Sequence, residues 1–249
     1  MSRPQPAASL AANLPANLPA NLPDILARGD VWRGDALARL TREGVASGYP
    51  ELDAELPGGG WPQGELTEFL MEKSGIGELS LLQPALASLS GAGGWIALVA
   101  PPFLPHAPAW QAAGIDLGRL LVVEAREQAA WSCEQLLAGG GFAAVLAWPG
   151  REGDARTLRR LQVAAEGSRT LAFVWRSQAV ARQPSPAPLR LMLSTGAEGL
   201  AVRILKRRGR PMAGWRPLPI LRPGRRNHAM AGAPFPAAAP RSPELSLHV

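Results

Sequence analysis

Residues 65–80, ELTEFLMEKSGIGELS, contain the clearest indication of the fold. They begin with an alternating, largely apolar run at 65–70, which predicts a strand entering a sheet. A short loop with two glycines, Gly75 and Gly77, follows. The Leu-rich segment from Glu78 to Ser90 then predicts a helix. A strand, a glycine-containing loop and a helix in this order form the unit in which α/β proteins hold phosphate groups at a helix N-terminus.

The chain continues to alternate between strand and helix signals after this unit. Apolar runs predict further strands at 94–100, 120–123, 142–148 and 170–175. Helices are expected between them, at 108–114, 127–138 and 154–166. The run at 94–100 has no polar residue after its glycine, which is typical of a parallel strand buried on both faces. This alternation predicts an α/β fold with a mostly parallel sheet and flanking helices.

The pattern changes near the end of this region. Two alternating segments, 189–193 and 200–205, are separated by a turn that contains Gly196 and Gly199. This arrangement predicts an antiparallel β-hairpin, which we expect at the edge of the sheet. The core is therefore expected to span residues 48–209.

Both ends of the chain differ from the core in composition. Residues 1–23 contain Ala-Asn-Leu-Pro three times, and proline at every fourth position forbids a regular helix or strand, so we expect a disordered tether. A role for this tail in binding a partner stays open. Residues 24–47 predict a helical arm, with Asp30 and Asp35 as its candidate caps. Residues 210–249 are rich in Pro and Arg, and we expect order to fade there.

Charge is distributed unevenly along the chain. The net charge is +6, yet no Asp or Glu occurs between Glu198 and Glu244, while ten Arg and Lys residues lie there. Such asymmetry predicts binding to a polyanion or to an acidic protein surface. Codon usage that enriches Arg throughout the chain is the alternative explanation.

Other classes of protein are disfavoured by composition. Cys133 is the single cysteine, which excludes an internal disulfide, and the three His residues are far apart in the sequence, so we expect no metal site. No apolar run is long enough to predict a membrane span, and the sequence favours a cytoplasmic protein.

The loop at 71–80 lacks the residues that ATP chemistry needs. A working phosphate loop requires glycines whose N–H groups wrap the phosphates, a Lys for their charge and a Ser or Thr for magnesium. Gly77 can stand for the last glycine, but Glu78 occupies the Lys position and Leu79 the hydroxyl position, and Glu72 replaces the first glycine. A carboxylate at that point repels a triphosphate. The alternative is that Lys73 reaches a phosphate from an unusual position.

The other positions of an ATPase site also differ. The strand at 142–148 ends in Trp148, where a magnesium-binding Asp belongs. The strand at 94–100 leads to Pro101, Pro102 and Phe103, where an acidic water-activating residue belongs. No Gly-x-Ser-x-Gly motif occurs. We therefore expect no catalysis and no cofactor, and we expect Trp61, Trp95, Trp148 and Trp175 to be core residues.

Several motifs together resemble the RecA-like ImuA family. GYPELDAELPGGGWPQGELTE at 48–68 resembles the segment that precedes the first strand and phosphate loop of RecA. The similarity to the ImuA family spans about residues 28–220 and is specific only in combination. It is carried by DVWRGD at 30–35, PGGGWP at 57–62, GIGEL at 75–79, AW at 147–148, RRLQVAAE at 159–166, PLRL at 188–191 and ILKRRG at 204–209.

The resemblance implies a role in SOS-induced mutagenic translesion DNA synthesis. The implied partner is ImuB, a polymerase-like protein without activity, and through it an error-prone C-family DNA polymerase and the sliding clamp. Contact with RecA or with DNA, and with it an association with the nucleoid, is left open. SulA-type inhibitors, which bind the division GTPase, share the RecA-like fold and the incomplete loop, and they are the alternative. The length of the chain and its Arg-rich C-terminal region favour ImuA.

The candidate site residues form two groups. The first is the degenerate nucleotide loop, represented by Gly75, Gly77, Glu78 and Leu79. The second is a surface for a partner or for DNA, because Arg binds phosphates and acidic proteins alike and buried Trp often anchors an interface. It consists of Arg203, Lys206, Arg207, Arg208, Arg210, Trp215, Arg216, Arg222, Arg225 and Arg226. For Trp215 to Leu221 the alternative is a last strand that closes the core.

Overall fold

The structure is a computed structural model of the chain, and it describes residues 43–150, 153–196, 199–208 and 214–220. The expected N-terminal tail, most of the expected helical arm and the sequence after Ile220 lie outside the described residues, so the expectations for them stay predictions.

The fold is built on one sheet of eight strands in the order β3-β2-β4-β5-β1-β6-β7-β8. Strands β1 to β6 run parallel to one another, whereas β7 runs antiparallel to β6, and β8 antiparallel to β7. The strands are β1 (Leu66–Met71), β2 (Trp95–Val99), β3 (Leu120–Val123), β4 (Phe142–Ala147), β5 (Leu171–Ser177), β6 (Leu189–Gly196), β7 (Gly199–Lys206) and β8 (Arg216–Leu218). The expected α/β class, a mostly parallel sheet with an antiparallel C-terminal hairpin, is confirmed.

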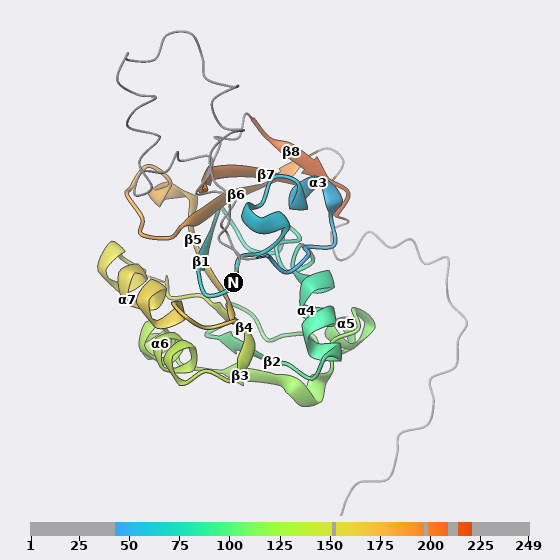
Figure 1. The fold of residues 1–249 in the computed structure, drawn as a ribbon, viewed down its shortest axis with the longest axis vertical. Helices are drawn as coiled ribbons and strands as arrows, with labels where there is room; N and C mark the ends of the chain where they lie inside the picture. The colour runs from blue at the N-terminus through green and yellow to red at the C-terminus, as the bar shows by residue number, and fades with distance from the viewer. Residues whose placement is uncertain (1–42, 151–152, 197–198, 209–213, 221–249) are drawn as a thin grey trace, which may run out of the picture.

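Helices cover both faces of the sheet (Figure 1). One face carries α6 (Ala129–Gly139) and α7 (Ala155–Ala165), and the other carries α3 (Pro50–Asp53), α4 (Gln83–Gly91) and α5 (Ala107–Ala112). Short 3-10 turns complete the connections: η2 (Pro57–Gly59), η3 (Leu117–Arg119), η4 (Arg126–Gln128) and η6 (Gln178–Val180).

Two apolar layers follow from this arrangement. The layer under α3 and α4 includes Trp61, Phe69 and Phe173, and the layer under α6 and α7 includes Leu66 and Val145. All six residues of β1 are buried, because β1 has β5 on one side, β6 on the other and a packed layer on each face. The central position of β1 explains why its sequence lacks an exposed polar face.

Two segments of secondary structure differ from expectation. The helix expected from Glu78 begins only at Gln83, since residues 78–82 form turns. Residues 43–47, expected at the end of the helical arm, are not helical, because Val45 forms an antiparallel bridge with Trp61.

One tryptophan expected in the core is not buried. Trp95 is 43% exposed, because it lies at the start of β2, where Arg119 rather than an apolar layer covers its ring. Trp61 and Trp175 are buried, as expected, and Trp148 is half-buried.

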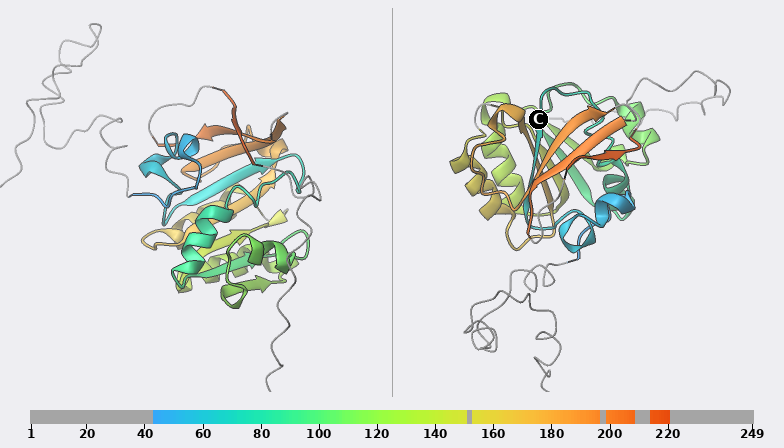
Figure 2. Two further views of the ribbon diagram at one scale, coloured as in Figure 1. Left: turned by 90° about the vertical axis from the view of Figure 1, so that its right-hand side faces the viewer. Right: turned by 90° about the horizontal axis from the view of Figure 1, so that it is seen from above.

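The C-terminal part of the described chain belongs to the sheet. Residues 216–218 form β8, which pairs with β7, and the side chains of Leu218 and Ile220 are buried in the apolar layer under α4. Figure 2 shows β7 and β8 at the end of the sheet opposite β3. The packed core thus extends past residue 209 to Ile220, as in the alternative interpretation of this segment.

Candidate functional site

The loop after β1 is closed by its own acidic residue. The Glu78 carboxylate accepts hydrogen bonds from the backbone N–H of Gly75, at 2.9 and 3.1 Å to its two oxygens, and from that of Ile76 at 2.9 Å. Gly75 and Gly77 have φ values of 84° and 99°, a region that residues with a Cβ rarely adopt. The glycines therefore allow the loop to curl so that its amides converge on an anion, and that anion is Glu78.

Glu78 does more than repel a phosphate, because its carboxylate also takes up the hydrogen bonds that the loop amides could offer. Backbone N–H groups that converge in a loop form a binding site for phosphate oxygens. Here the amides of Gly75 and Ile76 are used by a carboxylate of the same loop, whose residue is only 6% exposed. Behind the loop, a Cβ placed on Gly77 would lie 3.5 Å from Ile220, so the C-terminal segment backs the loop as well.

Two stacked tryptophans lie at the position where an ATPase has its magnesium-binding Asp. Trp148, directly after β4, stacks on Trp175 of β5, with ring centroids 4.5 Å apart and an angle of 10° between the planes. Trp175 in turn contacts Phe69 and Phe173 of the core, with centroids 5.2 and 6.3 Å away. Two indole rings therefore occupy the carboxyl ends of β4 and β5.

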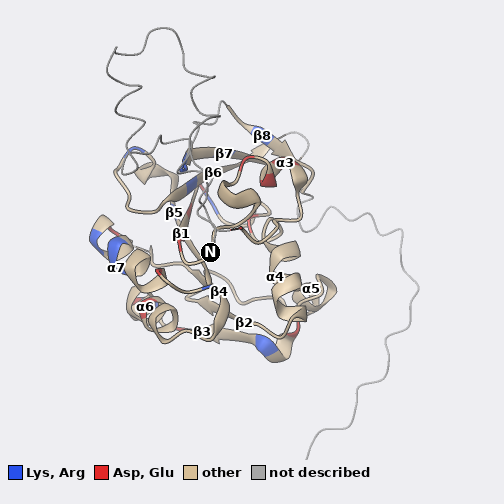
Figure 3. Ribbon diagram, in the orientation of Figure 1, with Lys and Arg blue, Asp and Glu red and all other residues tan. Residues whose placement is uncertain are grey.

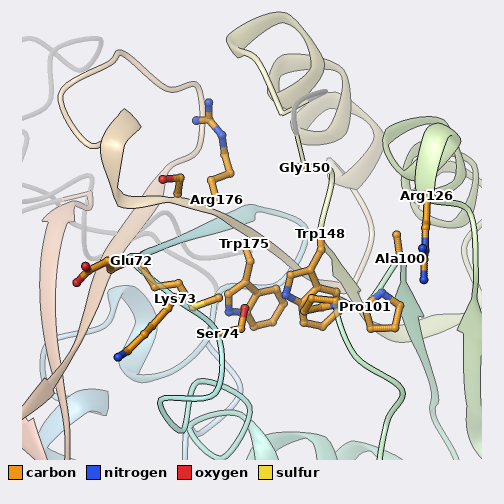
Figure 4. Close-up of a pocket in the computed structure, with 13 residues that line it drawn as sticks. Glu72, Lys73, Ser74, Ala100, Pro101, Arg126, Trp148, Gly150, Trp175 and Arg176 are labelled. Carbon is orange, nitrogen blue, oxygen red and sulfur yellow. The ribbon is translucent and has the colours of Figure 1, made fainter.

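A cavity of about 660 Å³ lies at the carboxyl ends of β1, β2, β4 and β5. This is the place where α/β sheets bind their ligands. Trp148, Trp175, Pro101 and Pro102 supply its apolar lining. Figure 4 shows Lys73 on one side of the tryptophan pair and Arg126 on the other. Its remaining lining residues are Met71, Glu72, Ser74, Ala100, Gly150, Arg176 and Ser177.

A buried ionic cluster lies next to this cavity, and no motif in the sequence predicted it. Glu68 in β1 has no exposed side-chain surface and binds Arg176 of β5 and Arg190 of β6, each across 2.7 Å. Burial raises the pKa of Glu68, but hydrogen bonds from Ser185, Arg176 and Arg190 outweigh it and hold the pKa below its usual value. The one signal in the sequence was a Glu inside an otherwise apolar central strand.

The same cluster fixes the connection between β5 and β6. The Arg190 guanidinium also donates to the carbonyl oxygens of Ala181 and Gln183, at 3.3 and 3.1 Å. Lys206 donates to the carbonyl oxygen of Ser185 at 2.8 Å, and its partial burial and the nearby Arg190 lower its pKa. Arg190 of β6 and Lys206 of β7 therefore both hold residues 181–185 through hydrogen bonds to backbone carbonyl oxygens.

The basic residues expected to form a free surface are partly engaged within the chain. Arg207 binds the Glu55 carboxylate at 2.9 Å and also donates to the Glu55 carbonyl oxygen, while Arg216 approaches the same carboxylate at 3.5 Å. Arg208 pairs with Glu65 at 2.7 Å. Arg203 is exposed on β7. Figure 3 shows how these charges are distributed over the fold.

Of the other residues of the predicted surface, one lies exposed beside β8 and four lie outside the described residues. Trp215 is 41% exposed, immediately before β8. Arg210, Arg222, Arg225 and Arg226 lie outside the described residues. Arg203 and Arg216 thus lie in neighbouring strands at the same edge of the sheet, but Arg216 is opposite the buried Val202 and projects from the other face than Arg203.

Three further features of the described residues bear on possible sites: metal-binding groups, the Cys133 thiol and the length of the helices. No group of three or more His, Cys, Asp or Glu residues there is placed to hold a metal ion. Burial, with Glu134 nearby, raises the pKa of the Cys133 thiol to about 12, so this thiol stays protonated. None of the helices described has the length and apolar character needed to cross a membrane.

The chain is thus an α/β protein with a mostly parallel sheet, in which a carboxylate of the loop after β1 accepts the hydrogen bonds of that loop's amides. The model of one protein family, described as the MT3502 N-terminal domain, matches residues 54–180, about half of the chain. The chain belongs to this family. The match runs from the end of α3 to the turn after β5 and so includes the loop, the tryptophan pair and every lining residue of the cavity. No curated protein matches the chain.

Proposed function

We propose that this protein is a non-catalytic, ImuA-like accessory factor of damage-induced mutagenic translesion DNA synthesis, and that it acts by binding ImuB. The observation that supports a non-catalytic role most directly is the set of hydrogen bonds from Gly75 and Ile76 to Glu78. An ATP phosphate needs those same amides, and it would have to displace an anion that is covalently tethered beside them. The tryptophan pair at the end of β4 and β5 removes the magnesium ligand in addition.

The resemblance to the ImuA family, which spans about residues 28–220, supplies the biological process and the partner. A fold without the residues for ATP chemistry acts through its surface. The edge of the sheet formed by β7 and β8 carries Arg203 and Trp215, both exposed, and Trp and Arg are enriched among the residues that dominate interface energies. We therefore place the ImuB contact on this surface, together with Arg222, Arg225 and Arg226.

Co-purification tests the proposal. The full chain is co-expressed with ImuB, with RecA and with the division GTPase in separate experiments, and each partner is captured in turn. We expect the chain to be retained by ImuB. Retention by the division GTPase alone would contradict the proposal and support the SulA-like alternative.

A pair of matched variants locates the contact. Trp215→Ala combined with Arg203→Ala should weaken retention by ImuB, because it removes the proposed anchor and a neighbouring charge. Trp131→Ala serves as the control, since Trp131 is 55% exposed on α6, away from the hairpin. Equal retention of both variants would remove this surface from consideration.

The absence of catalysis is measured separately. Purified protein with magnesium and ATP, with and without single-stranded DNA, should release no phosphate above the background. A turnover that Lys73→Ala abolishes would show that Lys73 serves a phosphate after all and would overturn the non-catalytic role.

A further inference from the structure

We propose that the cavity at the carboxyl ends of β1, β2, β4 and β5 binds a nucleotide by its base, with the base stacked on Trp148. The proposal deepens the proposed function, on which it rests for the expectation that the chain works on DNA. Its ligand chemistry is a nucleobase that carries a phosphate, supplied by an unpaired base of single-stranded DNA or by a free mononucleotide.

The aromatic wall of the cavity is prepared for stacking. Trp148 is held by its stack on Trp175, and Trp175 is only 3% exposed and packed on Phe69. The indole of Trp148 therefore has one fixed orientation beside the cavity. Pro101 and Pro102 add rigid apolar surface to the cavity lining. Rigid aromatic surfaces of this kind bind unpaired bases of any sequence, because every base has a π-face.

Charged groups at the cavity suit a phosphate on either side of the base. Lys73 and Arg126 are exposed and lie on opposite sides of the tryptophan pair in Figure 4. Glu72 is the one carboxylate among the lining residues. A third cation, Arg176, is engaged by Glu68 and leaves Lys73 and Arg126 for the ligand. Phosphate neutralisation by such side chains makes nucleic acid binding sensitive to salt.

The closed loop decides which part of the nucleotide enters. Because Glu78 uses the loop amides, a phosphate chain has no cradle next to the cavity. The base is left as the part that can be recognised, and the phosphate remains at the rim near Lys73 or Arg126. Binding should therefore depend neither on magnesium nor on the number of phosphates, which distinguishes it from ATP binding in a phosphate loop.

Photo-cross-linking and affinity measurements test the inference with the full-length chain. A short single-stranded oligothymidine that contains iodo-deoxyuridine is irradiated with the protein, and the adduct is mapped by mass spectrometry. We expect the adduct on the peptide that contains Trp148. Trp148→Ala should weaken binding of the oligothymidine about tenfold, as expected for the loss of one stacked base. The control Trp131→Ala should bind like the wild type.

Further variants keep the test independent of folding. Trp148→Phe retains an aromatic face and should restore much of the affinity. Lys73→Glu changes an exposed residue and should weaken binding and its salt dependence. An oligonucleotide of the same length with abasic sites should bind the wild type as weakly as oligothymidine binds Trp148→Ala.

The other possible results would either overturn the inference or identify the source of the base. Equal binding of abasic and thymidine oligonucleotides, or adducts confined to residues after Arg203, would overturn the inference. Competition by thymidine monophosphate would identify free nucleotides as the source of the base, and its absence would identify single-stranded DNA. If Trp148→Ala loses ImuB but DNA binding is unchanged, the cavity serves the protein partner and the inference fails. If ImuB is retained without base-dependent binding, the inference fails while the proposed function stands.

Discussion

Glu68 and Arg190 are direct neighbours in the register of β1 and β6, and the Arg190 Nε donates to the Glu68 carboxylate across 2.7 Å. Both side chains are almost completely buried, and Arg176 from the opposite neighbour, β5, holds the second carboxylate oxygen. One carboxylate thus joins the three central strands and, through Arg190, the connection at 181–185. This cluster stands directly before the loop and beside the cavity.

Removing the carboxylate should destabilise the fold strongly. Glu68→Ala leaves two buried guanidinium groups without their anion, which costs about 3–5 kcal/mol of unfolding free energy. Glu65→Ala is the matched control, because its partner Arg208 is 56% exposed and such a pair contributes about 0–1 kcal/mol. Urea denaturation measures both variants. Similar losses for the two would show that the buried cluster contributes no more than a surface pair.

The contribution of Glu68 should depend on pH with a defined sign. The folded pKa of Glu68 lies below its usual value, so the unfolded chain takes up this proton first as the pH falls. The stabilisation is complete above the ordinary Glu pKa of about 4.3 and disappears as the pH falls through the folded pKa. The stability difference between the wild type and Glu68→Gln should therefore shrink on acidification. A difference that is constant with pH, measured by denaturation at several pH values, would contradict this.

The segment 214–220 should be required for folding. Leu218→Ala and Ile220→Ala each remove a buried side chain, and large-to-small changes of this kind cost about 2–5 kcal/mol. Truncation after Gly209 removes both residues together with β8 and should yield an unstable or insoluble chain. Truncation after Ile220 keeps them and should unfold cooperatively, with a midpoint close to that of the full chain. A stable protein ending at Gly209 would assign this segment to the partner surface alone.

Opening the loop should create an anion site. Glu78→Ala frees the N–H groups of Gly75 and Ile76, at a cost of about 1.5–3 kcal/mol for hydrogen bonds to a charged group. Inorganic phosphate should then raise the melting temperature of Glu78→Ala and leave that of the wild type unchanged, since a ligand stabilises only the state that it binds. Glu72→Ala, an exposed acid of the same loop, is the control. Equal phosphate effects on all three proteins would argue against the carboxylate as an internal anion.

Much of the fold could be predicted because its signals are local. An alternating run identified β1, apolar runs identified β2 to β5, and the alternating segments around Gly196 and Gly199 identified the hairpin of β6 and β7. For Trp215 to Leu221 the sequence left a partner anchor and a last strand as alternatives, because the three residues of β8, Arg216–Leu218, form too short a pattern to decide between them. Trp95 shows the same limit, because hydrophobicity alone does not tell whether a neighbouring element covers a side chain.

Part of the candidate site could also be predicted from the sequence, and part could not. The sequence identified the loss of the Lys, the hydroxyl and the Asp at Glu78, Leu79 and Trp148, because motif positions follow from spacing along the chain. It did not indicate that Glu78 turns back to bind Gly75, or that Arg207 and Arg216 reach Glu55 from the other end of the chain. Pairs far apart in sequence leave no periodic signal.

Residue types at fixed spacing were enough to predict the α/β class, the order of the strands from β1 to β7 and the lack of the Lys, hydroxyl and Asp of an ATPase. The folded chain was needed to show that Glu68 joins Arg176 and Arg190, that Trp148 stacks on Trp175 beside a cavity, and that Ile220 closes the core behind the loop. Those relationships require strands separated in the chain to become neighbours in one sheet. The physical reason is that burial and pairing are properties of the whole fold, whereas periodicity is a property of a segment.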